Sequence, residues 1–240
     1  MPIRSRKAKL SVLYPPGVPV ILATHNNGKV SVNEGSSAFL ECQVDGAKPA
    51  ATISWSTADQ TASTAWIDSK KSRTMKDEET QRFKTISSIQ FHVDRSMQNT
   101  TIVCTAENVA SKTPTSTSVQ LDVLTKPKVS LGLNTGTGTV REGDTVVVQC
   151  IVDANPPPYG ITWRKNGVVL NGENNQRLAL NNIDSSFNNA VVSCEARNSL
   201  GAETASTTMK LLFAPKIIVN PKSVTKKVNK IIIYTRISCP

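Results

Sequence analysis

The sequence predicts an all-β chain with two tandem β-sandwich domains and a truncated third domain at its carboxyl end. Its 240 residues give room for two domains, each of about 100 residues. Val, Thr, Ser and Asn are plentiful, and Pro and Gly punctuate the chain at short intervals, which favours strands and turns over helices. A pattern of two cysteines and a tryptophan also occurs twice, and this indicates a repeated domain.

The repeat defines the domain organisation. In each copy a tryptophan follows the first cysteine by 13 residues, and a second cysteine comes later. The two cysteines are 62 residues apart in the first copy and 44 in the second, so the first copy has 18 extra residues after its tryptophan. The two sets are Cys42, Trp55 and Cys104, and Cys150, Trp163 and Cys194.

Strands are expected around each cysteine. Residues 39–44 and 146–152 are rich in β-formers and follow a Glu-Gly turn. Further along the first copy, apolar residues alternate with other residues over 89–93 and 102–106, and the second copy repeats this over 178–180 and 192–196. A period of two with one apolar face predicts strands that bury one side in a sandwich.

The repeat also sets the expected boundaries. Residues 16–125 form the first domain and residues 126–214 the second. Residues 1–15 are the end of a preceding domain or a linker; their basic start superficially suggests a signal peptide, but Pro15, Pro16 and Gly17 interrupt the apolar stretch. Residues 215–240 are either the start of a third domain or a non-native tail, and the sequence leaves both open.

The formal net charge of +10 lies in the two ends of the chain. Residues 1–10 carry four basic residues, residues 216–240 carry six, and neither segment has an acidic one. Between them, 18 basic residues balance 18 acidic ones. Because the expected domains are neutral, we predict no nucleic-acid partner.

The residues that catalysis and metal binding need are isolated from one another. The five cysteines, Cys239 among them, are too widely spaced for zinc or redox pairs, and His25 and His92 each stand alone. The sequence has no phosphate-binding glycine loop and no GxSxG motif. We therefore predict no enzyme activity, no cofactor, no metal and no small-molecule substrate. Widely spaced cysteines in apolar strands favour disulfides and an oxidising compartment.

The repeated order of cysteine, tryptophan and cysteine resembles the immunoglobulin superfamily, of the I-set or C2 type common in cell-adhesion receptors. The segments VREGDTVVVQC, ITWRKNG and CEARNSLGAE carry the likeness. The resemblance implies a disulfide within each domain, Cys42 to Cys104 and Cys150 to Cys194, with Trp55 and Trp163 packed on them. It departs from the family where Ile102 and Val192 replace a tyrosine that often holds the corner before the sixth strand.

The phrases SMQNTTIVCTAEN and LFAPK, with the missing tyrosine, resemble nephrin-like cell-recognition receptors. This narrower resemblance implies an internal piece of a single-pass protein on the extracellular side of the plasma membrane, with a cell junction as one location. The membrane span would lie outside this chain, because no run approaches 18 apolar residues. The implied partners are other cell-surface immunoglobulin-superfamily proteins, and homophilic and heterophilic binding both stay open.

Three residues are candidates for surface function. Asn99 begins the only N-glycosylation pattern in the chain and precedes an expected strand. Trp66 and Arg73 lie in the extra residues of the first copy, where an aromatic beside basic residues is a tentative partner contact. The alternative is that Trp66 covers the sheet from an extra strand and the charges solvate a longer loop.

Cell–cell adhesion or recognition through protein binding is the leading hypothesis for function. Two alternatives stay open, the ligand-binding exterior of a receptor kinase or phosphatase and an extracellular-matrix array protein. The sequence beyond Pro240 would separate them, because it would hold a span with a short tail, a kinase or phosphatase, or further repeats alone.

Overall fold

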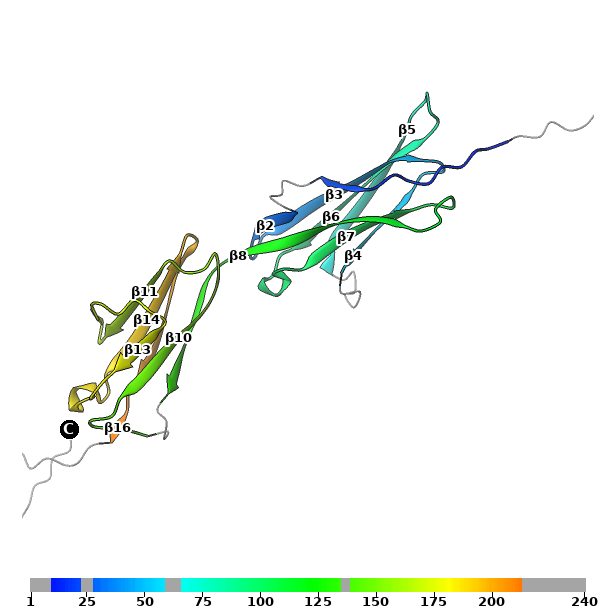
Figure 1. The fold of residues 1–240 in the computed structure, drawn as a ribbon. Coiled ribbons are helices and arrows are strands. Elements are labelled where there is room, and N and C mark those ends of the chain that lie inside the picture. Colours follow the sequence, from blue (N-terminus) through cyan, green and yellow to red (C-terminus); the bar gives the residue numbers. More distant parts are fainter. Residues whose placement is uncertain (1–9, 23–27, 59–65, 135–138, 213–240) are drawn as a thin grey trace, which may run out of the picture. The chain divides into compact units, whose positions relative to one another are not determined.

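The alternating segments of both repeats fold as β-strands, together with short turns of 3-10 helix (Figure 1). The computed structural model describes residues 10–22, 28–58, 66–134 and 139–212. The chain divides into two compact units between Thr125 and Lys126. Within the described ranges, no helix has the length and apolar character that crossing a membrane requires. The predicted all-β fold is confirmed, whereas the expected third domain, His25 and Cys239 lie outside the described residues.

The first unit is a sandwich of two sheets. One sheet has the order β1-β3-β6-β5, with antiparallel neighbours. The other joins β4, β7 and β8 in antiparallel order, and β2 runs parallel to β8. The strands are β1 (Val20–Leu22), β2 (Lys29–Asn33), β3 (Ser37–Ala47), β4 (Thr52–Thr57), β5 (Ser69–Lys76), β6 (Phe83–His92), β7 (Thr101–Glu107) and β8 (Thr115–Asn134).

The second unit has a comparable plan, built from the end of β8 and the strands β9 to β16. β8 is a strand of 20 residues that pairs with β7 in the first unit and with β10 in the second. β10 also pairs with β13, a second sheet has the order β12-β11-β14-β15, and β16 runs parallel to β9. The strands are β9 (Val140–Arg141), β10 (Val146–Asn155), β11 (Gly160–Lys165), β12 (Val168–Val169), β13 (Arg177–Leu180), β14 (Val191–Asn198), β15 (Gly201–Thr208) and β16 (Leu211–Leu212).

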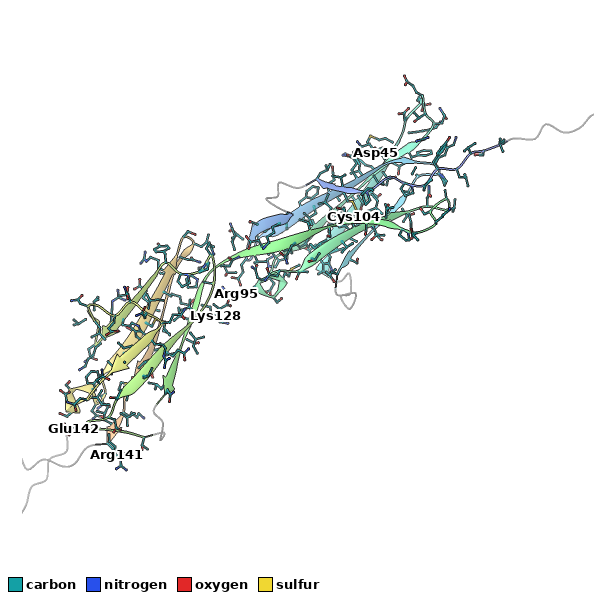
Figure 2. All side chains as sticks on the ribbon, viewed as in Figure 1. Asp45, Arg95, Cys104, Lys128, Arg141 and Glu142 are labelled. Atoms are coloured by element: carbon teal, nitrogen blue, oxygen red, sulfur yellow. A yellow bond between two sulfur atoms is a disulfide. The ribbon has the colours of Figure 1, made fainter. Side chains whose placement is uncertain are left out.

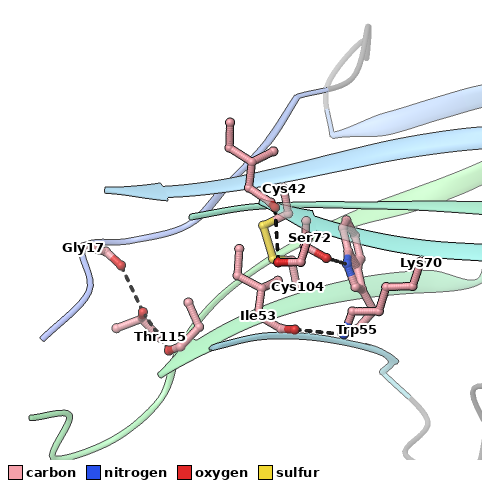
Figure 3. Close-up of a disulfide and its surroundings, with 11 residues drawn as sticks. Gly17, Cys42, Ile53, Trp55, Lys70, Ser72, Cys104 and Thr115 are labelled. Atoms are coloured by element: carbon pink, nitrogen blue, oxygen red, sulfur yellow. Dashed lines mark hydrogen bonds between the residues drawn. A yellow bond between two sulfur atoms is a disulfide. The ribbon is translucent and has the colours of Figure 1, made fainter. Parts of the chain in front are cut away.

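A disulfide joins the two sheets of the first unit at the centre of its core. Cys42 on β3 and Cys104 on β7 are bonded, with their Cα atoms 6.6 Å apart, and both are fully buried (Figure 3). Trp55 on β4 lies opposite Cys104 in the β-ladder and is only 4% exposed. Its Nε1 donates to Ser87 Oγ at 3.1 Å, so the indole N–H keeps a partner inside the core.

The second unit has the same arrangement. Cys150 on β10 and Cys194 on β14 form a disulfide with Cα atoms 6.2 Å apart. Trp163 lies opposite Cys194 and is fully buried. Its Nε1 donates to the carbonyl oxygen of Asn175 at 2.8 Å. The two cores therefore share one frame, although the partner of the indole differs.

Side-chain amides hold the corner where the tyrosine is missing. In the first unit, η2 (Arg95–Met97) is capped by Asp94, whose carboxylate accepts from the backbone N–H of Ser96 at 2.8 Å. Gln98 then accepts from the backbone N–H of Val123 on β8. Arg95, which is labelled in Figure 2, also pairs with Glu34 at 2.9 Å.

The second unit builds its corner in the same way. Asp184 caps η3 (Ser185–Phe187), and Asn188 Oδ1 accepts from the backbone N–H of Leu211 at 3.2 Å. In both units an amide one residue after the helical turn bonds to the last strand. These amides tie the corner to the sheet, as a tyrosine hydroxyl does in many relatives of this fold.

The asparagine that ends each CxAxN segment ties two loops together. Asn108 Nδ2 donates to the carbonyl oxygens of Tyr14 at 2.8 Å and Pro49 at 2.9 Å. Asn198 Nδ2 donates to the carbonyl oxygen of Pro156 at 3.0 Å. Each asparagine thus bonds the loop that follows the strand of the first cysteine, between β3 and β4 in the first unit and between β10 and β11 in the second, which explains why the repeat contains it twice.

Candidate binding surface

On the outward side of the β4-β7-β8 sheet, two adjacent rows consist of small uncharged residues, with Glu107 beyond one row and Asp122 beyond the other. Trp55 and Cys104 point into the core, so their neighbours along each strand point outward. The register places Ser54, Thr105 and Ser116 in one row, and Ser56, Val103 and Ser118 in the next. We call these six residues, all half-buried or exposed, the first-unit face.

The first-unit face is chemically suited to contact with another protein. Removing a hydroxyl from water costs far less than removing a charged group. Charged residues are accordingly depleted at the cores of protein interfaces. Val103 adds apolar surface between Ser56 and Ser118. Contact over these rows would therefore bury apolar area without stripping water from an ion.

The corresponding side of the second unit carries ion pairs. The register places Thr162, Glu195 and Thr204 in one row, and Arg164, Ser193 and Ser206 in the next; we call these six the second-unit face. Glu195 accepts from Arg164 at 2.8 Å through Oε2, and from Arg197 at 3.1 Å through Oε1. The two faces thus occupy equivalent places in their units but differ in charge.

The two arginines keep Glu195 ionised. The hydrogen bond from Arg164, followed by the one from Arg197, holds the pKa of Glu195 below its ordinary value. Two cations around one anion leave the cluster with a net positive charge. A partner at the second-unit face would have to match that charge or displace its water.

β5 is a basic edge strand that contains the predicted contact residue Arg73. All eight of its residues are exposed, and β6 is its strand neighbour. Arg73 lies 3.8 Å from the Glu41 carboxylate, with 65% of its side chain exposed. Lys70 Nζ donates to the carbonyl oxygen of Ile53 at 3.0 Å (Figure 3). These charges lie on a strand rather than in the expected loop, and basic side chains on an edge strand hinder pairing with another chain.

Trp66 lies against the core of the first unit. Its ring meets that of Phe91 edge-on, with centroids 5.0 Å apart and an interplanar angle of 85°. The residue is half-buried and precedes β5. Trp66 therefore covers the sheet, whereas Arg73 pairs with Ile86 on the outward side. The structure does not bring these two candidates onto one surface.

Asn99 lies between η2 and β7 and is exposed. Its backbone N–H donates to the carbonyl oxygen of Leu121 at 3.0 Å. Gln120 Nε2 donates to the carbonyl oxygen of Asn99 at 3.2 Å. The main chain at this position is fixed while the residue stays open to solvent.

The described residues contain no cluster suited to metal binding or thiol chemistry. No group of three or more His, Cys, Asp or Glu side chains lies close enough within the described ranges to hold a metal ion. All four described cysteines are in disulfides, so none of them has a free thiol.

Two family models match the chain, one in each unit. A model for the CD80-like C2-set immunoglobulin domain matches residues 23–115. A model for the immunoglobulin domain matches residues 126–198. Each match contains both cysteines and the buried tryptophan of its unit.

Known proteins resemble nearly the whole chain. Human "Kin of IRRE-like protein 1" is 33% identical over 239 residues, 97% of this chain and 29% of that protein. Human "Cell adhesion molecule 3" is 30% identical over 217 residues, 88% of this chain and 51% of that protein. The solved ectodomain (Ig1–Ig3) of mouse nectin-like molecule 4 superposes with a TM-score of 0.70 at 25% identity, over 90% of this chain and 69% of that one. The chain spans less than a third of the length of the first relative.

Proposed function

We propose that this chain, which belongs to the immunoglobulin superfamily, binds other proteins outside the cell in cell–cell adhesion or recognition. The observation that carries the proposal is the similarity of almost the whole chain to Kin of IRRE-like protein 1 and to a protein named as a cell adhesion molecule. The two intradomain disulfides support an oxidising, extracellular compartment. The parent protein would then display both units at the cell surface.

The first-unit face is the surface that we propose for partner contact. It joins three strands of one sheet, so its residues are held at fixed spacing by the backbone ladder. It lacks charged residues, and so it can meet the same face of a second copy without like-charge repulsion. A different immunoglobulin-superfamily protein with an uncharged face is an equally suitable partner. The proposed partner class is therefore cell-surface immunoglobulin-superfamily proteins, homophilic or heterophilic.

Bead aggregation tests this function. Beads coated with the full chain would be mixed with beads coated with the same chain, and separately with beads coated with the exterior of human Kin of IRRE-like protein 1. We expect one of the two mixtures to aggregate, and soluble chain to compete. Absence of aggregation in both mixtures, with both disulfides intact on the beads, would contradict the proposal.

A further inference from the structure

We propose that Asn99 carries an N-linked glycan and that the equivalent corner of the second unit carries none. Asn99 follows η2 with φ 63°, in the left-handed region that asparagine tolerates better than most residues. Its neighbour Gln98 is bound to β8, which leaves Asn99 on the exposed side of the turn. Asn99 is followed by Thr100 and Thr101, which complete the acceptor pattern.

The second unit has the same corner without the acceptor pattern. Asn189 has φ 59°, is exposed, and donates its backbone N–H to Met209 at 2.9 Å, as Asn99 does to Leu121. Two residues later stands Val191, where the first unit has Thr101. The backbone geometry therefore matches, and the hydroxyl at the third position is the difference that decides modification.

The modification replaces one amide hydrogen of Asn99. The side-chain nitrogen forms a bond to the anomeric carbon of an N-acetylglucosamine, the lipid-pyrophosphate carrier of the oligosaccharide donor leaves, and one proton is released. No hydrogen bond to the side-chain amide of Asn99 competes within the described residues, and the attached sugar would extend into solvent.

The glycan would border the proposed binding surface, a consequence that rests on the proposed function. Thr101 pairs with Gln120 in the row next to Val103 and Ser118, and Gln120 bonds the main chain of Asn99. The sugar would therefore limit the approach of a partner at this end of the first-unit face and leave the rows of Val103 and Thr105 open.

Matched variants test the glycan without reference to any partner. The full chain, secreted from glycosylating animal cells, would be weighed before and after enzymatic removal of N-glycans. We expect the natural chain to lose one glycan, Asn99→Gln and Thr101→Val to lose none, and Val191→Thr to lose two. Thr101→Val is the variant least expected to disturb folding, because the second unit already has a valine, Val191, at the equivalent position. If the natural chain shows no loss of mass, the proposal is overturned, whether Val191→Thr gains a glycan or not.

Discussion

The two units share the same core arrangement and differ in the side chains on their surfaces. Both have a disulfide between sheets, a buried tryptophan beside it, an amide-bonded corner and an asparagine that ties the loops. The first unit adds the basic strand β5 and shows an uncharged face, whereas the second shows an Arg-Glu-Arg cluster. The residues of this shared core are repeated, whereas the residues on the outward faces of the two sheets differ. Partner specificity in such a chain therefore depends on the surface residues of each unit and not on the fold that the units share.

The edges of the two units are protected in different ways. In the first unit β5 covers the edge of β6 and carries four basic residues, Lys70, Lys71, Arg73 and Lys76. In the second unit no strand pairs with the far side of β13 in the described ranges, and β13 has only four residues. Charged side chains and short length are both devices that hinder unwanted strand pairing.

The largest expected effect is loss of a disulfide, and it should stay within one unit. Replacing both cysteines of a pair, as in Cys150→Ala with Cys194→Ala, should lower the free energy of unfolding of that unit by about 2–5 kcal/mol. The matched pair Cys42→Ala with Cys104→Ala should act on the first unit alone. Denaturant unfolding followed by peptide-level hydrogen exchange separates the units. If removal of one cysteine pair lowered the free energy of unfolding equally in both units, the prediction that each disulfide stabilises its own unit would be wrong.

The next effect distinguishes the two loop asparagines by burial. Asn198 is 2% exposed and Asn108 is half-buried. Asn198→Ala leaves buried groups without partners and should cost about 1–3 kcal/mol in the second unit. Asn108→Ala should cost less in the first unit, because water can replace a partly exposed hydrogen bond. Thermal unfolding of each variant checks this order, and a reversed order would contradict the burial argument.

The smallest effect is a pH dependence of the second unit. The pKa of Glu195 is lower in the folded chain than in the unfolded one, so its contribution is present above about pH 4.3 and is lost as the pH falls through the folded value. For a partly exposed pair this contribution is about 0.2–1 kcal/mol. Glu195→Gln should flatten this part of the pH profile of the second unit in acid unfolding. The profile of the first unit, which has Thr105 at this place, should not change.

Much of the frame could be predicted from the sequence, because it depends on strict spacing. The positions of Cys42, Trp55 and Cys104 fix which strands face each other, and the resemblance to the immunoglobulin superfamily is confirmed by two family models. The means of holding the corner was not predicted. Gln98 and Asn188 are polar loop residues whose hydrogen bonds depend on a strand far along the chain.

The first-unit face was harder to predict, because it also depends on which residues of distant segments lie side by side in the sheet. The Ser and Thr residues of the first-unit face look like ordinary polar positions until the register aligns them in rows. The signal that was available is the choice of uncharged residues at the outward positions on either side of Trp55 and Cys104 and at Ser116 and Ser118. Trp66 was a candidate contact residue because it is an aromatic residue near basic ones, but its ring packs edge-on against that of Phe91.

A matched pair of charge insertions tests the central claim, that the first-unit face carries recognition. Val103→Glu places a carboxylate in the middle of the uncharged rows, and Ser193→Glu places one at the equivalent position of the second unit. In the bead assay, with whichever partner aggregates the natural chain, Val103→Glu should weaken binding at least about tenfold, a change of about 1.4 kcal/mol. Ser193→Glu should leave binding near that of the natural chain. Equal binding by the two variants would contradict the account.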